Sequence, residues 1–329
     1  MINIGINGFG RIGKCLFLQL LENDNVIVKA INIPDFDIHF FEHYLKVDSN
    51  HHYNKKWSVK VINDKQVRVD DNLITILNSR YPSNLKWSDY DIEYLIDTTG
   101  VFLTKEKAEE HKVPYFIMCA PPKDDTPQFM VNANEDKYNG QSIVSNASCT
   151  SNCLIPVLKF LNDNYTILDG NFNTIHAATA SQKTVDTTKM NKRTCRSIFN
   201  NIIPHTTGAS KSIGKILPEL KGKLLGASVR VPVSNVSLVN LNVRLEKNTT
   251  LKEIFKKIQT VNFIELEEKK FMVSCDFMTN TCPSIIDANA SMDLQNNQFK
   301  IVIWYDNEWS YSYKVIQLLE HIILFNNKM

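Results

Sequence analysis

Hydrophobic and polar positions follow two different spacings in the N-terminal half of the chain. Short apolar runs rich in β-branched residues predict strands, whereas residues 11–22 carry Ile12, Leu16 and Leu20 at helical spacing. The predicted strands lie at 2–8, 26–32, 59–62, 66–69, 73–77, 94–97 and 115–118. Strands that alternate with helical stretches are typical of βαβ units, so this half is predicted to be an α/β domain with a parallel, doubly wound sheet.

The pattern changes after Cys149. Residues 153–161 look helical, and Pro156 within them is expected to remove a hydrogen bond and bend the helix. Long strands are predicted at 171–179, 226–233, 236–245 and 300–306, before a final helical stretch at 311–325. This order predicts an α+β domain with an antiparallel sheet. Ligand sites often lie between domains, so the boundary expected just before Cys149 is a candidate site.

Composition narrows the class of protein. A chain of 329 residues with 43% hydrophobic residues can bury large cores and suggests two domains. The net charge of +2 gives no general attraction to nucleic acid, although a local basic site could bind a small anion. The chain starts directly on the strand-like MINIGING, and no apolar run is long enough to cross a bilayer. We therefore expect a cytoplasmic protein that needs neither a membrane nor a nucleic acid.

A glycine-rich turn connects the first predicted strand to the first predicted helix. Gly8, Gly10 and Gly13 form a G-x-G-x-x-G sequence there. Glycine at these positions lets the backbone turn sharply, approach a pyrophosphate closely and pack the helix on the sheet, while the helix start supplies partial positive charge. A merely structural turn is the alternative. The strand–turn–helix setting favours dinucleotide binding.

The acid that usually accompanies this turn is missing. A ribose-binding Asp or Glu is expected at the end of the second strand, where this chain has Asn32 and then Ile33. Asp35 and Asp37 follow slightly later. An apolar residue at the strand end removes the charge that would repel a 2′-phosphate, so NADP becomes admissible beside NAD.

The segment SNASCTSNC surrounds the cysteine at the domain boundary. Seven cysteines scattered along the chain are typical of reduced thiols, and Cys149 and Cys153, four apart, fit neither a CxxC redox pair nor a paired zinc motif. Asn146 and Ser148 are good helix N-cap types, and a helix N-terminus can lower a thiol pKa, so a thiolate nucleophile is predicted at Cys149. The alternative is a packing cysteine, which suits Cys153.

His176 ends the predicted strand 171–179, and a Cys–His pair is the minimal arrangement that activates a thiol. A lone histidine is more often structural, so this role stays open from the residues alone. The histidine-rich segment 39–52 lacks further ligands at a recognised metal spacing, and no metal site is expected.

Two other segments are candidates for anion binding. Residues 205–211, HTTGASK, precede a helical run and offer hydroxyl and backbone N–H groups. Arg230 lies between apolar residues in a strand, where an arginine either pairs internally or binds a phosphate. The basic stretch 189–196 also fits a solvated loop.

With these motifs in view, the chain resembles the phosphorylating glyceraldehyde-3-phosphate dehydrogenases. The resemblance covers essentially the whole chain and includes INGFGRIG, SNASCTSNC, HAATASQKTVD, NIIPHTTGA, VRVPVSNVS and WYDNEW. It implies a Rossmann domain at 1–148, completed by a C-terminal helix at 308–329. It further implies a catalytic α+β domain at 149–307 with a mixed, mainly antiparallel sheet, and a homotetramer.

The resemblance also implies roles for individual residues. Cys149 would be the nucleophile and His176 its activator in the oxidation of glyceraldehyde 3-phosphate to 1,3-bisphosphoglycerate. Inorganic phosphate would be bound by Ser148, Thr150, Thr207 and Gly208, and the substrate's own phosphate by Thr179 and Arg230. The positions that would contact the cofactor are Gly8, Gly10, Arg11, Ile12, Gly13, Asn32, Ile33, Arg80, Thr99, Gly100, Phe102, Cys119, Asn307 and Tyr311.

Some positions depart from the family pattern. Ile33 replaces the ribose-binding aspartate of NAD-dependent members, Cys119 a common serine and Ser310 a common glycine. The loop 187–190 lacks the usual Gly-Pro and is one residue shorter, as in relatives that accept NADP. The expected cofactor is therefore NAD or NADP. The alternatives are erythrose-4-phosphate dehydrogenase and a catalytically silent nucleotide- or RNA-binding protein.

Overall fold

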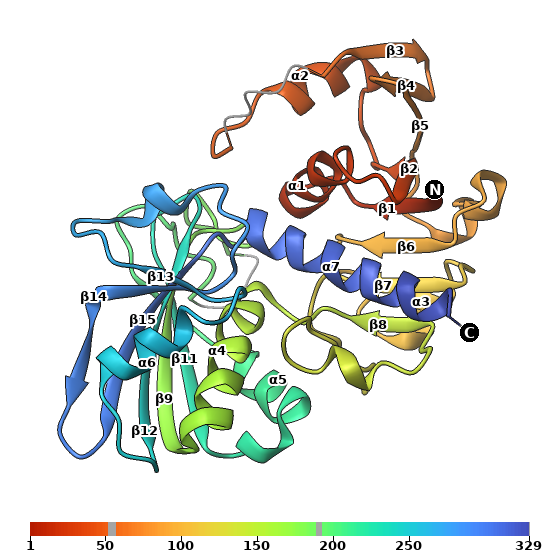
Figure 1. Ribbon diagram of the computed structural model, residues 1–329. Helices are drawn as coiled ribbons and strands as arrows, with labels where there is room; N and C mark the ends of the chain where they lie inside the picture. The colour runs from red at the N-terminus through yellow and green to blue at the C-terminus, as the bar shows by residue number, and fades with distance from the viewer. Residues whose placement is uncertain (52–56, 189–192, 329) are drawn as a thin grey trace. The chain divides into compact units, whose positions relative to one another are not determined.

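The computed structural model describes residues 1–51, 57–188 and 193–328. His52 and the loop residues Lys189 and Met190 lie outside the described residues. The chain folds into two compact units, both drawn in Figure 1. The first comprises Met1–Val131, Glu135–Ala147 and Ser312–Met329, and the second comprises Asn132–Asn134 and Ser148–Tyr311.

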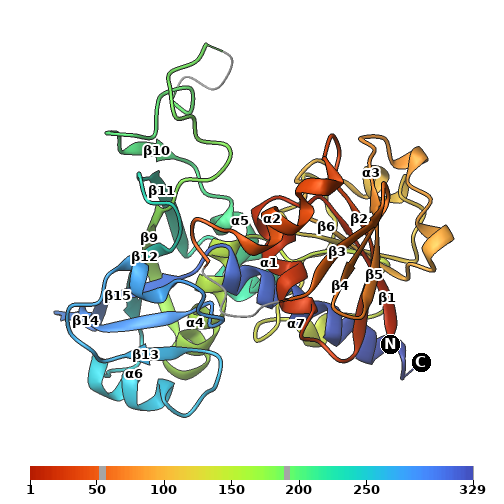
Figure 2. The same cartoon turned by 90° about the horizontal axis from the view of Figure 1, so that it is seen from above.

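The first unit is built on an eight-stranded sheet with the order β3-β4-β5-β2-β1-β6-β7-β8. Its strands are β1 (Ile2–Asn7), β2 (Val26–Asn32), β3 (Val59–Asn63), β4 (Gln66–Val69), β5 (Asn72–Leu77), β6 (Tyr94–Asp97), β7 (Tyr115–Met118) and β8 (Ile143–Ser145). The strands predicted from the sequence are confirmed. In the order in which they lie in the sheet, β5, β2, β1, β6, β7 and β8 pair in parallel. The sheet is therefore mostly parallel, as predicted. At the edge seen in Figure 2, β3, β4 and β5 pair antiparallel, because the turns between them are too short for a crossover.

Helices complete this unit. They are α1 (Arg11–Leu20), α2 (Phe41–Lys46), α3 (Lys105–Glu109) and α7 (Trp309–Asn326). The C-terminal α7, blue in Figure 1, packs on residues of the first unit: Asn326 Nδ2 donates to the Tyr94 hydroxyl, and the Phe325 ring meets the Tyr138 ring edge-on. The predicted helix at 311–325 is therefore confirmed.

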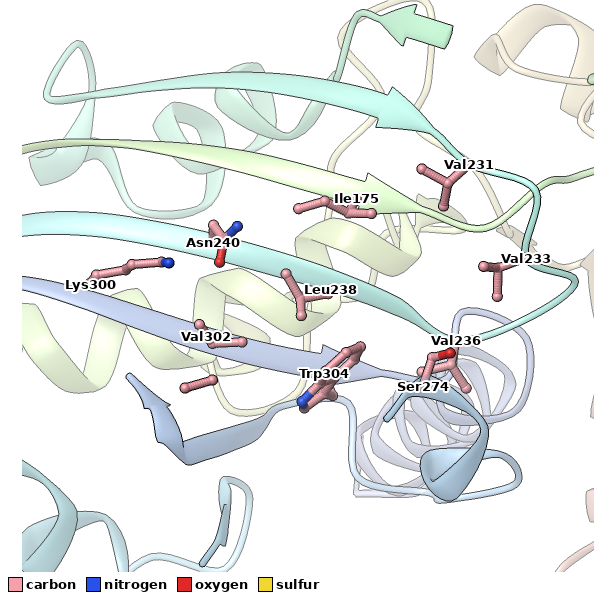
Figure 3. A pocket seen from close by; sticks show the side chains of 11 residues that line it. Ile175, Val231, Val233, Val236, Leu238, Asn240, Ser274, Lys300, Val302 and Trp304 are labelled. Atoms are coloured by element: carbon pink, nitrogen blue, oxygen red, sulfur yellow. The ribbon is translucent and has the colours of Figure 1, made fainter. Parts of the chain in front are cut away.

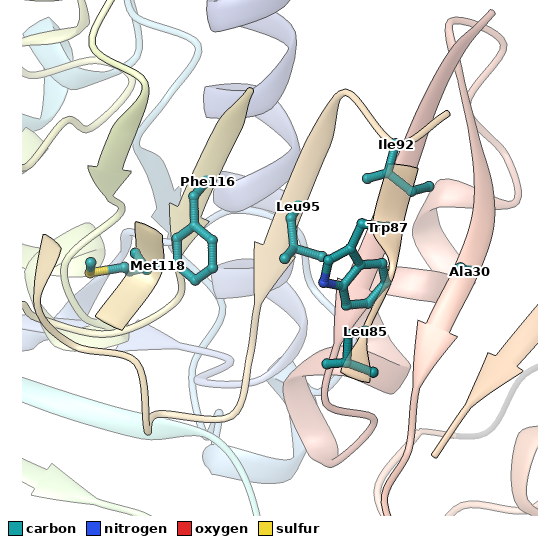
Figure 4. Packing of buried hydrophobic residues seen from close by; sticks show 8 residues of the cluster. Ala30, Leu85, Trp87, Ile92, Leu95, Phe116 and Met118 are labelled. Atoms are coloured by element: carbon teal, nitrogen blue, oxygen red, sulfur yellow. The ribbon is translucent and has the colours of Figure 1, made fainter. Parts of the chain in front are cut away.

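A buried aromatic cluster supports one side of the sheet. The indole of Trp87 packs among Leu85, Ile92 and Leu95, as Figure 4 shows. Its Nε1 donates a hydrogen bond to Nδ1 of His111, 3.2 Å away. The cluster thus contains one polar pair in an otherwise apolar environment.

The second unit is built on a seven-stranded mixed sheet with the order β10-β11-β9-β12-β15-β14-β13. Its strands are β9 (Ile167–His176), β10 (Ile203–His205), β11 (Leu224–Arg230), β12 (Ser237–Leu245), β13 (Glu265–Glu267), β14 (Ile285–Leu294) and β15 (Gln298–Tyr305). Four neighbouring pairs are antiparallel, whereas β9–β11 and β13–β14 are parallel. The predicted fold class, α/β plus an α+β unit with a mixed, mainly antiparallel sheet, is confirmed.

The helices of this unit are α4 (Cys149–Tyr165), α5 (Ala209–Ile216) and α6 (Leu251–Ile258). Pro156 lies inside α4, which continues beyond it. Short 3₁₀ turns occur at η1 (Ile38–Phe40), η2 (Pro82–Asn84), η3 (Trp87–Tyr90), η4 (Glu135–Lys137), η5 (Pro218–Leu220) and η6 (Ser274–Phe277). Helix α4 packs against α5 and against strands β9, β12 and β15, which places its first turn beside the ends of these strands.

Candidate active site

Helix α4 begins at Cys149, as the sequence predicts. Ser148 is its N-cap, and the Ser148 hydroxyl accepts the backbone N–H of Ser151 at 3.1 Å. The preceding Ala147 has φ of +51°, in the left-handed region that costs a residue with a side chain about 1–2 kcal/mol. This cap places Cys149 in the first turn of the helix. Cys153, one turn later, is fully buried, as expected of a packing residue.

His176, the last residue of β9, lies opposite Cys149. The distance from Cys149 Sγ to His176 Nε2 is 3.4 Å, and His176 Nδ1 is 2.8 Å from the carbonyl oxygen of Ala177. These contacts orient the ring so that one nitrogen faces the thiol and the other faces the backbone. The two residues that the sequence singled out separately are therefore in contact.

The electrostatics of this pair differ from the sequence-based expectation. Burial raises the pKa of Cys149, although the charge of Arg230 and the backbone N–H of Thr150 act in the opposite direction. Burial, and then the charge of Arg230, lowers the pKa of His176 to about 3. The predicted lowering of the thiol pKa is wrong because desolvation outweighs the helix start. Burial thus favours the uncharged form of both side chains.

Arg230 is the third member of this cluster. It ends β11 and is in register with His176 on the parallel neighbour β9. Its Nη1 lies 2.5 Å from His176 Nδ1 and 3.1 Å from the Ala177 carbonyl oxygen. Its Nε is buried and has no hydrogen-bond partner among the described residues. A guanidinium with an unused donor at this position can bind an anion.

Two residues that the sequence analysis missed support the cluster. The Tyr305 hydroxyl is 2.8 Å from Thr150 Oγ1, and the Tyr305 ring stands edge-on to the His176 ring. Ser237 Oγ accepts the N–H of Ala177 and donates to Asn307 Oδ1, at 3.1 and 2.7 Å. Tyr305 directly follows the apolar run 301–304, and Ser237 directly precedes Leu238 and Val239, a signal that could have found them. Ser237 thus connects the His176 backbone segment to Asn307.

The other predicted phosphate ligands lie in separate turns of the second unit. Thr179 is held by Gln182, whose Oε1 accepts from the Thr179 backbone N–H and hydroxyl at 2.9 and 3.0 Å. Thr207 Oγ1 accepts the N–H of Ala209 at 3.2 Å, and Gly208 directly precedes α5. Among the described residues, no hydrogen bond joins either turn to Cys149.

The glycine-rich turn of the first unit fits a pyrophosphate. Gly8 has φ of +91°, and a Cβ on Gly13 would lie 2.3 Å from the Gly8 carbonyl oxygen, so both positions require glycine. Gly10 precedes α1 without a side-chain cap, and no acid follows in the first turn. Among the described residues, a Cβ on Gly10 would meet nothing within 4 Å. The chain therefore leaves open space beside Gly10, directly before the start of α1.

Several predicted cofactor residues line one cavity of the first unit. It measures about 360 Å³ and is lined by Asn7, Asn32, Pro34, Ser79, Arg80, Leu85, Thr99, Val101 and Phe102. Gly100, with φ of +68°, lies between two of these residues. Ile33 does not line the cavity and is only 8% exposed. The cavity therefore combines apolar walls with a few polar groups, as small-ligand sites do.

The comparisons with known proteins agree with this geometry. Residues 2–105 match the family model "Glyceraldehyde 3-phosphate dehydrogenase, NAD binding domain", and residues 148–307 match "Glyceraldehyde 3-phosphate dehydrogenase, C-terminal domain". The chain is 43% identical to glyceraldehyde-3-phosphate dehydrogenase of Shimwellia blattae and to glyceraldehyde-3-phosphate dehydrogenase A of Escherichia coli K12. Each alignment covers 98% of this chain and 99% of the relative. The chain belongs to the glyceraldehyde-3-phosphate dehydrogenase family.

Membership of this family confirms the resemblance inferred from the sequence. It confirms a dehydrogenase that uses a nicotinamide dinucleotide, since the N-terminal match is to an NAD binding domain. The alternative functions are not favoured. No helix within residues 1–51, 57–188 and 193–328 is long and apolar enough to cross a membrane. None of the seven cysteines, all of which lie within the described residues, is bonded to another in a disulfide.

The family's cofactor positions are supported by polar groups that the sequence analysis missed. Asn32 Nδ2 donates to Asn7 Oδ1 and to the Ser79 carbonyl oxygen, at 2.8 and 2.9 Å. Asn7 Nδ2 in turn donates to Asp97, which also accepts from the hydroxyl of Thr99. Burial raises the pKa of Asp97 to about 7 despite these bonds. The side chain of Asn32 is therefore occupied within the fold and holds two strand ends together.

The remaining predicted cofactor residues also lie within one unit or the other, and several of them form hydrogen bonds there. Arg11 forms two hydrogen bonds of 2.7 and 2.8 Å with Asp48, and the buried Lys14 pairs with the same carboxylate. Ile12 accepts a hydrogen bond from the Ser312 hydroxyl through its carbonyl oxygen. The Cys119 N–H donates to the Asp97 carbonyl oxygen at 2.9 Å. Asn307 and Tyr311, both buried, belong to the second unit.

Proposed function

We propose that this chain is a phosphorylating glyceraldehyde-3-phosphate dehydrogenase. It would oxidise D-glyceraldehyde 3-phosphate with NAD or NADP and inorganic phosphate to 1,3-bisphosphoglycerate. The observation that carries the proposal is the contact of Cys149 Sγ with His176 Nε2 at 3.4 Å, with Arg230 on the other ring nitrogen. The relatives bear the name of this enzyme, which supports the same substrate.

The first step uses the neutral imidazole as a base. When Nδ1–H of His176 donates to the Ala177 carbonyl, Nε2 carries the lone pair and can accept the thiol proton. Cys149 Sγ then bonds to the aldehyde carbon, and the carbonyl electrons move to oxygen. The N–H groups at the start of α4 stabilise this oxyanion, and the protonated His176 then donates its proton to it, which returns the imidazole to its neutral form. The product of the step is a thiohemiacetal on Cys149.

Oxidation and phosphorolysis follow at the same sulfur. The bound nicotinamide would supply the hydride acceptor. His176 takes the hydroxyl proton as the C–H bond breaks, which leaves a thioester on Cys149. Phosphate then attacks the thioester carbon and the thiolate leaves, giving the acyl phosphate. Ser148, Thr150, Thr207 and Gly208 would bind this phosphate, and Thr179 and Arg230 the phosphate of the substrate.

A homotetramer belongs to the same proposal. The sheet of the second unit has a hollow of about 430 Å³ lined mainly by apolar side chains, shown in Figure 3. They include Ile175, Val231, Val233, Leu238, Val302 and Trp304. A half-buried apolar face of this kind is typical of subunit interfaces. We infer that a second copy of this chain covers it.

The proposal extends to the two domains and to the cell. Residues 1–148 with 308–329 would bind the cofactor, and residues 149–307 would carry the reaction. Cysteines that form no disulfide are typical of a reducing compartment, which supports a cytoplasmic location.

The test is turnover of glyceraldehyde 3-phosphate with and without phosphate, beside the same assay with erythrose 4-phosphate. We expect turnover that depends on phosphate, favours the three-carbon substrate and is abolished in Cys149→Ser. Cys275→Ser, which changes an exposed cysteine, is the matched control and should remain active. Faster use of erythrose 4-phosphate would contradict the proposal. A Cys149 that iodoacetamide does not label in the native protein would indicate a catalytically silent binding protein.

A further inference from the structure

One exposed ion pair lies at the edge of the proposed cofactor cavity. Arg80 Nη2 and Nε lie 2.5 and 3.1 Å from Oδ2 of Asp35. Both side chains are 72% exposed, so the pair contributes little to stability. Its position is more informative, because Arg80 lines the cavity together with Asn32 and Ser79.

The loop backbone presents Asp35 to Arg80. Asp35 has φ of +58°, a conformation that aspartate tolerates better than most residues. Its N–H donates to Asn78 Oδ1 at 2.9 Å, which ties the loop after β2 to the segment after β5. This bond joins the two segments from which Asp35 and Arg80 project.

The neighbouring candidates for the missing acid are otherwise engaged. Ile33 is buried, and its N–H donates to the Leu77 carbonyl oxygen at 2.9 Å. Asp37 accepts the His39 N–H and caps a 3₁₀ turn. Of the two acids that follow the strand end, Asp35 is therefore the one that pairs with a residue of the cavity wall.

Building on the proposed function, we propose that Asp35 and Arg80 set the choice between NAD and NADP. A 2′-phosphate carries a charge of about −1.5 to −2, and a guanidinium binds it well. Here Asp35 already neutralises Arg80, so the phosphate must displace a carboxylate and remain near it. A 2′-hydroxyl meets no such repulsion and can donate to the carboxylate. Asp35 therefore favours NAD, and without it Arg80 would favour NADP.

Binding measured without aldehyde tests this inference. ADP-ribose and 2′-phospho-ADP-ribose are titrated calorimetrically into the full-length protein and into Asp35→Asn, Arg80→Gln and the double variant. We expect the wild type to favour ADP-ribose, and Asp35→Asn to shift the ratio of dissociation constants about tenfold toward the phosphorylated ligand, a change of about 1.4 kcal/mol. In the double variant, this shift toward the phosphorylated ligand should be absent. Asp37→Asn, two residues away, is the matched control.

The outcomes separate this inference from the proposed reaction. A ratio that Asp35→Asn shifts no more than Asp37→Asn overturns the role of Asp35. If the double variant still shows the shift toward 2′-phospho-ADP-ribose, the role of Arg80 is overturned. Binding of neither ligand overturns both the inference and the cofactor site. If the reaction fails while both ligands bind with the expected ratios, the inference stands and only the proposed chemistry is wrong.

Discussion

At the scale of single residues, Arg230 Nη1 and the Ala177 carbonyl oxygen both lie within hydrogen-bonding distance of Nδ1 of His176. If Arg230 Nη1 donates to His176 Nδ1, the imidazole hydrogen must be on Nε2, and that tautomer cannot take the Cys149 proton. If a substrate phosphate draws Arg230 away, Nδ1–H can donate to the Ala177 carbonyl and Nε2 is free. Binding of the substrate phosphate would then leave Nε2 of His176 able to accept the Cys149 proton.

Arg230→Leu tests this coupling. We expect kcat/KM for glyceraldehyde 3-phosphate to fall about 10²-fold, because truncating one partner of a charge-assisted pair costs about 2–5 kcal/mol. The rate of Cys149 alkylation should also shift to higher pH, since the positive charge that opposes the burial of the thiol is lost. The measurements are steady-state kinetics and the pH profile of iodoacetamide labelling.

Arg244→Leu is the matched control, because Arg244 is exposed and pairs with Asp169 on the strand surface. Both readouts should be unchanged in that variant. If the pH dependence of Cys149 alkylation is the same in Arg230→Leu as in the wild type, the guanidinium does not affect the pKa of the thiol.

At the scale of elements, the polar pair in the Trp87 cluster makes the first unit sensitive to pH. Burial lowers the pKa of His111 to about 4, from an ordinary value of 6.5. Its Nδ1 accepts from Trp87, and its Nε2 is buried without a partner among the described residues. The folded state therefore favours the neutral ring.

The sign of the effect follows from the lowered pKa. The unfolded chain binds the proton as pH falls below about 6.5, whereas the folded chain binds it only near 4. The contribution of His111 to the free energy of unfolding is thus fully present above pH 6.5 and is lost progressively as the pH falls to about 4. At about 1.4 kcal/mol per pKa unit, the loss is on the order of 3 kcal/mol.

His111→Phe should remove this part of the pH dependence. We expect the difference in unfolding midpoint between pH 7 and pH 4.5 to be smaller than in the wild type, measured by urea titration. His39→Phe, which changes an exposed histidine, should leave the difference as it is. An equal loss of stability in wild type and His111→Phe would contradict the assignment.

At the scale of the whole molecule, the apolar face of the second sheet is the strongest indication of assembly. The face lies along neighbouring strands β9, β12 and β15, so one charged residue on the middle strand would reach its centre. Leu238 stands on β12 in this hollow. A buried charge without a partner is costly, which makes this position sensitive to the interface.

Leu238→Glu is expected to convert the proposed tetramer into smaller species with an unchanged far-ultraviolet circular dichroism spectrum. Light scattering after size exclusion measures the mass. Leu324→Glu, on the exposed side of α7, should not change it. An unaltered tetramer in Leu238→Glu would place the interface elsewhere, and a monomeric wild type would overturn the tetramer itself.

The sequence by itself determined the features that depend on near neighbours in the chain. Strand and helix positions, the glycine turn at Gly8 and the cap at Ser148 follow from periodicity, backbone sterics and capping, each decided within a few residues. The family could be inferred from its motifs for the same reason, because each is a short contiguous stretch.

Only the tertiary structure decided what depends on packing between distant segments. The sequence misjudged the pKa of Cys149 because desolvation by surrounding chain outweighs the local helix dipole. It could not place Arg230 on His176, since that contact follows from the register of β9 with β11, 54 residues apart. The ion pair of Asp35 with Arg80 likewise joins residues 45 apart in the chain, which follow the ends of β2 and β5. Burial and long-range pairing are properties of the folded chain, and they determine the chemistry of the site.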